Sequence, residues 1–232
     1  MEAIILAGGF GTRLKEMVID VPKPMADING KPFLKYLFDW LLNNGIDHLI
    51  LAVGYKADVI QDYFSENYQG IHLSYSFEVE PLGTGGAIKK AYDKVKNKNR
   101  PVFVINGDTF FNVNLKEFYD FHNKQNNPFS IVVKKMFDFE RYGSVKTNDN
   151  FVEDFIEKRY CKQGFINGGI YLMNSVCMGM MPKDEKFSFE KTFLEKYVKS
   201  VSFGAFKSDG YFIDIGIPVD YTKAKIELPF KI

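Results

Sequence analysis

Short apolar runs alternate with amphipathic helical patterns over the first 130 residues, and this alternation limits what the chain can fold into. The runs have the length and branched content of β-strands, and they cover residues 3–8, 48–54, 71–78, 101–106 and 129–136. Between them, apolar residues recur at helical spacing, at Phe33, Leu34, Leu37 and Leu41, at Val59, Ile60, Tyr63 and Phe64, and at Leu115, Phe118, Tyr119 and His122. Because a right-handed connection between parallel strands needs a helix, the order predicts an α/β fold.

After residue 136 the pattern changes to short strands with little helix between them, followed by helical patterns at 188–199 and 218–227. We interpret this region as a small β-rich elaboration on the same sheet that forms one wall of a cleft. No linker rich in Pro, Gly or Ser separates the two parts, and the 46% hydrophobic content is enough for one substantial core. We therefore predict a single domain, residues 1–232, with a Rossmann-like mixed, mainly parallel sheet flanked by helices.

Charge and cysteine content exclude several classes of partner. Thirty Lys and Arg against 29 Asp and Glu give a net charge of +1, so no global field attracts nucleic acid or a membrane surface. The two cysteines, Cys161 and Cys177, lack the close spacing of a metal or redox motif. The start "MEAIILAGG" lacks the cationic region of a signal peptide, and the longest apolar runs are too short to cross a bilayer. We expect a cytoplasmic protein with no nucleic acid and no membrane as partner.

A glycine-rich loop, "LAGGFGTRL" at residues 6–14, follows the first predicted strand. Loops at the carboxyl ends of strands in such sheets bind ligands, and glycine lets backbone N–H groups close on an oxyanion. A tight turn without chemistry would need fewer glycines than Gly8, Gly9 and Gly11, and would not need Thr12 and Arg13 directly after them. The loop therefore favours phosphate binding. It is neither a P-loop, which needs Lys-Ser or Lys-Thr, nor a dinucleotide fingerprint, which needs glycine in place of leucine at residue 14.

Ten residues after the arginine of this loop, Lys23 lies between two prolines in "VPKPM". The prolines remove two backbone donors and fix φ on both sides, so the segment cannot be regular helix, and we expect an extended, stiff strip that presents one cation. "LAGGFGTRL" followed by "PKPM" resembles the signature of the sugar-1-phosphate nucleotidylyltransferases. Members of this family join a sugar 1-phosphate to a nucleoside triphosphate and release pyrophosphate. The resemblance extends from residue 3 to about residue 222.

The resemblance implies a metal site at two strand ends. Asp108 in "VFVINGD" and Asp214 in "GYFIDIG" match the aspartates with which the family binds metal. Taken singly, each is typical of a turn or a helix cap. Two carboxylates from distant strands suit Mg²⁺, which takes few protein ligands and keeps water and phosphate oxygens as the others. We expect Mg²⁺ as the cofactor.

The segment "EPLGTGGA", residues 80–87, resembles the family's base-recognition loop, which leads into a helix predicted from about Ala87 to Val95. The nucleotide would be held by Leu6, Gly8, Gly9, Gly11, Thr12, Glu80, Gly83 and Thr84. Guanine offers a carboxylate two adjacent donors, N1–H and the N2 amino group, whereas uracil offers one N–H on that edge. A carboxylate at Glu80 therefore favours GTP, although an exposed acid before a proline turn would look the same.

The resemblance places the sugar against the second part of the chain. The implied substrate-binding residues are Asn106, Gly143 in "RYGSV", Glu157 and Lys158 in "DFIEKRY", and Asn167 and Gly168 in "FINGGIYLMN". The nucleotide-binding part then covers about residues 1–136 and the sugar-binding part about residues 137–232. Arg13 and Lys23 are the expected catalytic residues: Arg13 holds the leaving phosphates and Lys23 the α-phosphate, while Lys158 meets the attacking phosphate.

Several stretches, "GYKADVIQDYF" and "NGDTFF" among them, look closest to family members that use D-glycero-α-D-manno-heptose 1-phosphate and GTP to make an activated sugar for capsule or lipopolysaccharide. Mannose 1-phosphate is the nearest alternative substrate. A metal-dependent glycosyltransferase would commonly show an Asp-x-Asp pair where this chain has "GDTFF". A catalytically silent sugar-nucleotide sensor would not need the two cations and two aspartates together. We expect GTP and a sugar 1-phosphate as substrates. The sequence is compatible with either a monomer or a homodimer.

Overall fold

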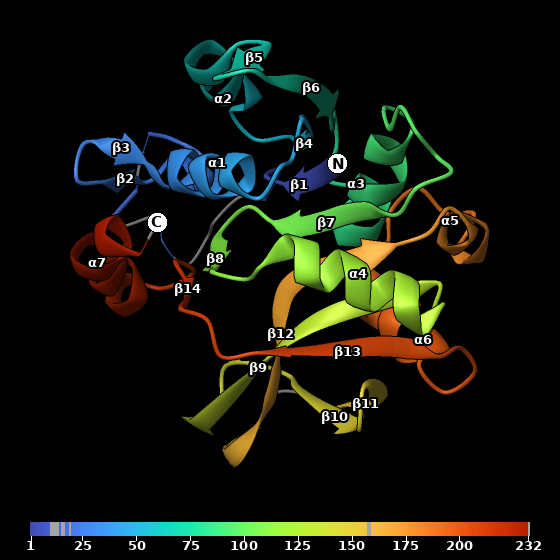
Figure 1. Cartoon of the computed structure of the whole chain (residues 1–232). Helices are drawn as coiled ribbons and strands as arrows, with labels where there is room; N and C mark the ends of the chain where they lie inside the picture. The colour runs from blue at the N-terminus through green and yellow to red at the C-terminus, as the bar shows by residue number, and fades with distance from the viewer. Residues whose placement is uncertain (10–13, 15–16, 19, 157–158, 232) are drawn as a thin grey trace.

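The computed structural model describes residues 1–9, 14, 17–18, 20–156 and 159–231, and one large sheet runs through it (Figure 1). The sheet has ten strands in the order β10-β11-β13-β9-β12-β7-β1-β4-β6-β5. In that order the strands are Ser144–Asn148, Phe151–Ile156, Phe203–Ser208, Phe129–Phe139, Cys161–Met173, Val102–Asn106, Glu2–Leu6, His48–Val53, Ile71–Phe77 and Asn67–Tyr68. All five strands predicted in the first 136 residues are confirmed, and so are the short strands after them. The last of these, β14 (Phe212–Asp214), does not join the same sheet as predicted, because it pairs with β8 (Thr109–Phe111) in a separate two-stranded sheet.

The sheet is mixed, and the prediction that it is mainly parallel holds for only part of it. The block β6-β4-β1-β7 is parallel, as is the pair β9–β13. In contrast, β12 runs antiparallel to both β7 and β9, and β10 and β11 pair antiparallel as well. The reason is the chain between β9 and β12, whose described residues form only β10 and β11 and no crossover helix. The boundary predicted near residue 136 falls inside β9.

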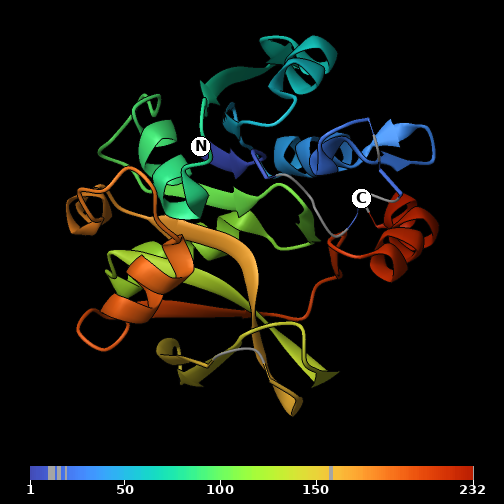
Figure 2. The ribbon, with the colours of Figure 1, turned by 180° about the vertical axis from the view of Figure 1, so that it is seen from behind.

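Helices cover both faces of the sheet. Helices α1 (Phe33–Asn43) and α4 (Leu115–Gln125) lie on one face. On the other face, seen in Figure 2, α3 (Gly83–Tyr92) lies next to η3, a π-helical turn at Glu190–Leu194 that continues into α6 (Glu195–Tyr197). The predicted helix at 188–199 is therefore confirmed in part, as a π-helical turn followed by a short α-helix. The other α-helices of the described residues are α2 (Ala57–Phe64), α5 (Val176–Met180) and α7 (Pro218–Glu227), and a 3-10 turn, η4 (Leu228–Phe230), follows α7.

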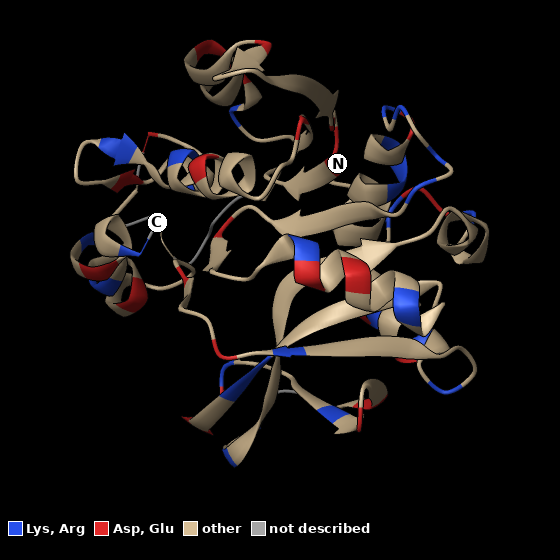
Figure 3. Ribbon diagram, in the orientation of Figure 1, with Lys and Arg blue, Asp and Glu red and all other residues tan. Residues whose placement is uncertain are grey.

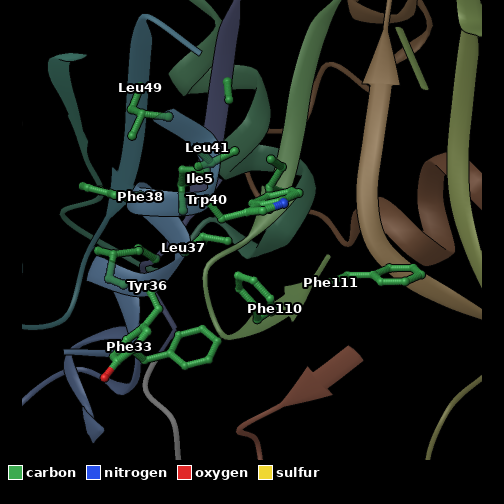
Figure 4. Packing of buried hydrophobic residues seen from close by; sticks show 14 of the residues in the cluster. Ile5, Phe33, Tyr36, Leu37, Phe38, Trp40, Leu41, Leu49, Phe110 and Phe111 are labelled. Atoms are coloured by element: carbon green, nitrogen blue, oxygen red, sulfur yellow. The ribbon is translucent and has the colours of Figure 1, made fainter. Parts of the chain in front are cut away.

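The core on the α1 face also holds in place a turn that matters for function. The apolar stripe of α1 is fully buried, and Figure 4 shows its residues packed against Ile5 of β1 and against Phe110. Phe110 belongs to β8 (Thr109–Phe111), and its ring meets Trp40 of α1 edge-on at 5.8 Å between centroids. This packing fixes the loop that connects β7 to β8.

Charge is distributed without a dominant sign. Figure 3 shows acidic and basic residues close together along α4 and α7, in agreement with the net charge of +1. Within the described part of the chain, every helix is too short or too polar to span a bilayer.

Candidate active site

Two aspartates from distant parts of the chain meet beside the carboxyl end of β7. Asp108 follows β7, and Asp214 ends β14 (Phe212–Asp214). Strands β8 and β14 pair antiparallel with Asp214 opposite Thr109, and the backbone N–H of Ile215 donates to the carbonyl of Asp108 at 3.0 Å. The fold therefore brings the two predicted metal ligands together.

Lys23 joins these aspartates from the proline-flanked strip. The strip is not regular α-helix, as predicted, but it is also not extended, because Lys23–Met25 form a short 3-10 turn, η2. The Lys23 ammonium forms an ion pair with the Asp108 carboxylate, and the two side chains are 16% and 34% exposed. A Cβ built on Gly216 would lie 3.5 Å from Nζ of Lys23 and 2.8 Å from Oδ1 of Asp214. Lys23 thus pairs with Asp108 and lies close enough to Asp214 to act on its charge.

The pair of carboxylates has the character of a cation site. Burial raises the pKa of Asp214, and the charge of Asp108 raises it further, while Lys23 and the Gly216 amide oppose the rise. A bound divalent ion would relieve this repulsion. The described residues contain no cluster of three or more His, Cys, Asp or Glu side chains that could hold a metal. That is compatible with Mg²⁺, which is commonly held by one or two carboxylates with water and substrate phosphates.

The first glycine loop starts beside this cluster. The N–H of Gly107, next to Asp108, donates to the carbonyl of Leu6 at 3.0 Å, and a Cβ at Gly107 would lie 2.7 Å from that oxygen. Gly8 lies against Gly54, whereas a Cβ at Gly9 would meet no atom of the described residues within 4 Å. Among those residues, none covers the backbone at Gly9. The predicted loop residues Gly11, Thr12 and Arg13 lie outside the described residues.

A carboxylate at this loop was missed by the sequence reasoning. A Cβ built on Gly8 would lie 2.6 Å from Oε1 of Glu78, and Oε2 of Glu78 accepts from the N–H of Leu82 at 3.0 Å. Burial raises the pKa of this carboxyl. Glu80, the predicted base-reading acid, is exposed. A signal was present, because Glu78 follows β6 directly at the strand edge where ligands bind, and its N–H continues the ladder to Val53.

The second glycine segment is part of a helix. The helix predicted from about Ala87 begins at Gly83, so Gly83 and Thr84 form its first turn. A Cβ at Gly85 would lie 2.0 Å from the Phe187 ring, and one at Gly86 would lie 2.0 Å from the carbonyl oxygen of Glu185. These glycines are thus needed for the close approach of a second chain segment.

A cavity of about 640 Å³ opens beside the aspartates. Its lining includes Asp214 and three of the predicted substrate-binding residues, Asn106, Gly143 and Asn167. Gly168 is not part of that lining. A Cβ there would lie 2.7 Å from the Phe111 ring, so Gly168 packs inward, and its neighbour Gly169 faces the cavity instead.

Hydrogen bonds order the floor of this cavity. The Asn167 amide donates to the Tyr171 hydroxyl at 2.7 Å, and its carbonyl oxygen accepts from the N–H of Gly169 at 2.9 Å. Gly169 has φ +72, and a Cβ there would lie 2.8 Å from the Asn106 amide. This bulge of β12 aligns two side-chain amides, suited to sugar hydroxyls. The predicted pair Glu157 and Lys158 lies outside the described residues.

Arg141 is a further cavity residue that the sequence reasoning did not single out. Its guanidinium forms an ion pair with Asp220 in the first turn of α7, and it lies 5.3 Å from the centroid of the neighbouring Tyr142 ring. It supplies a cation on the same side of the cavity as Asp214.

Comparisons with known proteins agree with this geometry. A family model described as nucleotidyl transferase matches residues 2–229. A D-glycero-alpha-D-manno-heptose 1-phosphate guanylyltransferase from Aneurinibacillus thermoaerophilus is 51% identical over 98% of both chains. The crystal structure of HddC from Yersinia pseudotuberculosis complexed with GMP-PN is similar with a TM-score of 0.86 and 41% identity, covering 97% of this chain and 98% of the other. A Saccharomyces cerevisiae mannose-1-phosphate guanyltransferase is 31% identical over 97% of this chain and 64% of its own length.

Proposed function

The chain belongs to the nucleotidyl transferase family, and we propose that it is a guanylyltransferase that joins GMP from GTP to D-glycero-α-D-manno-heptose 1-phosphate. One observation carries this proposal: the 51% identity to an enzyme of that name extends over 98% of both chains. The products are a GDP-sugar and pyrophosphate, and the GDP-heptose would serve capsule or lipopolysaccharide synthesis. Residues of about 1–136 bind the nucleotide and residues of about 137–232 the sugar.

The reaction is an in-line attack of the sugar phosphate oxygen on the α-phosphorus of GTP. A P–O bond forms there, and the bond to the leaving pyrophosphate breaks. Lys23 stabilises charge on the α-phosphate, Arg13 holds the leaving phosphates, and Lys158 meets the attacking phosphate. Asp108 and Asp214 would hold Mg²⁺, whose charge offsets that of the phosphate oxygens. The half-buried ion pair of Lys23 supports its role, because the ammonium is already positioned beside the metal ligands.

A carboxylate at the base would favour guanine, and two candidates lie two residues apart. We favour Glu78, because it is half-buried and lies against Gly8 in the first glycine loop, whereas Glu80 is exposed. Two adjacent donors of guanine would satisfy a carboxylate whose pKa burial raises, and uracil would leave one oxygen without a partner. Gly83 and Thr84 would contribute backbone groups beside the base.

The two glutamates serve as matched variants of each other. Glu78→Gln should reduce the preference for GTP over UTP, measured as the ratio of kcat/KM for the two nucleotides, by about 10-fold or more, as for a hydrogen bond to a charged group. Glu80→Gln should leave the ratio near the wild-type value. If Glu80→Gln reduced the ratio and Glu78→Gln did not, Glu80 would be the residue that selects guanine.

The sugar binds in the cavity, where Asn106, Gly143, Asn167 and the backbone at Gly169, in place of the predicted Gly168, contact its hydroxyls. The decisive experiment measures pyrophosphate release from four nucleoside triphosphates, each paired with heptose 1-phosphate or mannose 1-phosphate, with Mg²⁺ present. We expect the highest kcat/KM for GTP with the heptose. A clear preference for mannose 1-phosphate would reassign the sugar, and no release with any pair would identify a silent binding protein.

A further inference from the structure

One wall of the sugar cavity carries two carboxylates, Glu190 and Glu195, that none of the roles above uses, and Glu190 is the one held by hydrogen bonds to neighbouring segments. Ser188, Glu190, Lys191, Leu194 and Glu195 line the cavity from this wall. Glu190 begins the π-helical turn η3, and π-turns occur frequently at functional sites. The buried rings of Phe189 and Phe193 stack at 5.0 Å and 9° between planes, which anchors the turn.

The Glu190 carboxylate is held in a fixed position through one of its oxygens. Oε2 accepts from the Thr84 hydroxyl at 2.8 Å and from the Ser188 hydroxyl at 2.9 Å. The Thr84 oxygen in turn accepts from the N–H of Phe189 at 2.8 Å, so both hydrogen-bonding roles of this hydroxyl are used. The other carboxylate oxygen of Glu190, Oε1, accepts no hydrogen bond from the described residues.

The negative charge of this carboxylate limits which part of the substrates can lie beside it. The site must bring two polyanions together, and a carboxylate that holds no metal repels both of them. The phosphates belong at the end of the cavity with Lys23 and the Asp108–Asp214 pair. Glu190 is hydrogen-bonded to Thr84 in the first turn of α3, on the wall that Ser188 and Leu194 also line. Its free oxygen is therefore suited to a neutral donor, and sugar hydroxyls are the donors that this cavity would receive.

We propose that Oε1 of Glu190 accepts a hydrogen bond from a sugar hydroxyl, and that Thr84 and Ser188 are positioning residues for it. This inference rests on the function proposed above, since it assigns a ligand within that sugar site. It also gives Thr84 a role different from direct base contact: its hydroxyl connects the nucleotide segment to the sugar wall.

Separate KM values for heptose 1-phosphate and for GTP test the proposal. Glu190→Gln keeps the shape but removes the charge, and should raise the KM for the sugar phosphate about 10- to 100-fold, as for a hydrogen bond to a charged group. The KM for GTP should stay within about twofold, since the charged group is assigned to the sugar alone. Thr84→Val should raise the sugar KM in part, and Thr84→Ser should restore it. The matched control is Glu185→Gln, an exposed acid close in sequence.

Deoxy analogues of the sugar 1-phosphate identify the contact itself. Removal of the contacted hydroxyl should weaken binding to the wild type but weaken it no further in Glu190→Gln, because the two changes delete the same hydrogen bond. Equal losses in both proteins for every analogue would overturn the proposal. So would an unchanged sugar KM, or a parallel loss of GTP-induced thermal stabilisation, which would make Glu190 structural. If wild-type protein itself releases no pyrophosphate, the proposed function fails and this inference fails with it.

Discussion

Replacement of Lys23 by alanine tests the chemistry of the site most directly. The Lys23 ammonium pairs with Asp108 and stands close to Asp214, so its removal leaves two carboxylates without their cation. If Lys23 also holds the α-phosphate, the transition state loses one preorganised charged contact. Such a contact is worth about 2.7 to 4 kcal/mol, which lowers kcat roughly 100- to 1000-fold.

The cost in folding stability should be much smaller. The Asp108 side chain is 34% exposed, and ion pairs with substantial exposure contribute about 1 kcal/mol or less. For a chain of this size that corresponds to a fall in Tm of about 2–4 °C. The predicted effect on turnover is therefore far larger than any effect of partial unfolding at the assay temperature.

Steady-state pyrophosphate release at saturating GTP and sugar phosphate gives kcat, and a thermal melt of the same preparation gives Tm. Lys31→Ala, at an exposed lysine in β3 (Lys31–Pro32), is the control and should keep wild-type turnover. If the kcat of Lys23→Ala stayed within about threefold of wild type, Lys23 would have no part in the mechanism, because the expected loss is roughly 100- to 1000-fold.

Three further predictions concern the metal site, a buried histidine and a glycine contact. Asp214→Asn should raise the Mg²⁺ concentration needed for half-maximal pyrophosphate release, and an unchanged titration would remove Asp214 as a ligand. Burial lowers the pKa of His122 from 6.5, so the unfolded chain binds this proton more readily; wild-type stability should therefore fall as pH drops below 6.5, and urea melts of His122→Gln should show a flatter pH dependence. Gly86→Ala would place a methyl group 2.0 Å from the Glu185 carbonyl oxygen and should lower the free energy of unfolding by about 1–3 kcal/mol. Identical urea melting curves for the variant and the wild type would contradict this prediction.

The local sequence pattern was sufficient to predict the helices and strands of the first part of the chain and the residues that follow the strand ends. The apolar spacing in 33–41 predicts α1, and the branched runs predict β1, β4, β6, β7 and β9, because both periodicities are properties of a short segment. The prolines around Lys23 similarly exclude regular helix from η2. The meeting of Asp108 with Asp214 was predictable only through the family resemblance, since no periodicity relates residues so far apart.

Tertiary packing decided which of several similar residues faces the site. Glu78 and Glu80 are both acids near a glycine segment, but only the end of β6 puts Glu78 against Gly8. Gly168 and Gly169 are adjacent, yet the bulge in β12 turns the first toward Phe111 and the second toward the cavity.

The sequence by itself determined the alternation of strands and helices, the glycine loop and the residue types available for phosphate and metal chemistry. Only the tertiary structure placed Glu190 on the wall of the cavity, because its hydrogen bond to Thr84 joins residues 106 positions apart. That contact depends on glycines of α3 packing against the segment at 185–187. Secondary structure follows from interactions between near neighbours, whereas a binding site depends on contacts that exist only once distant segments have packed together.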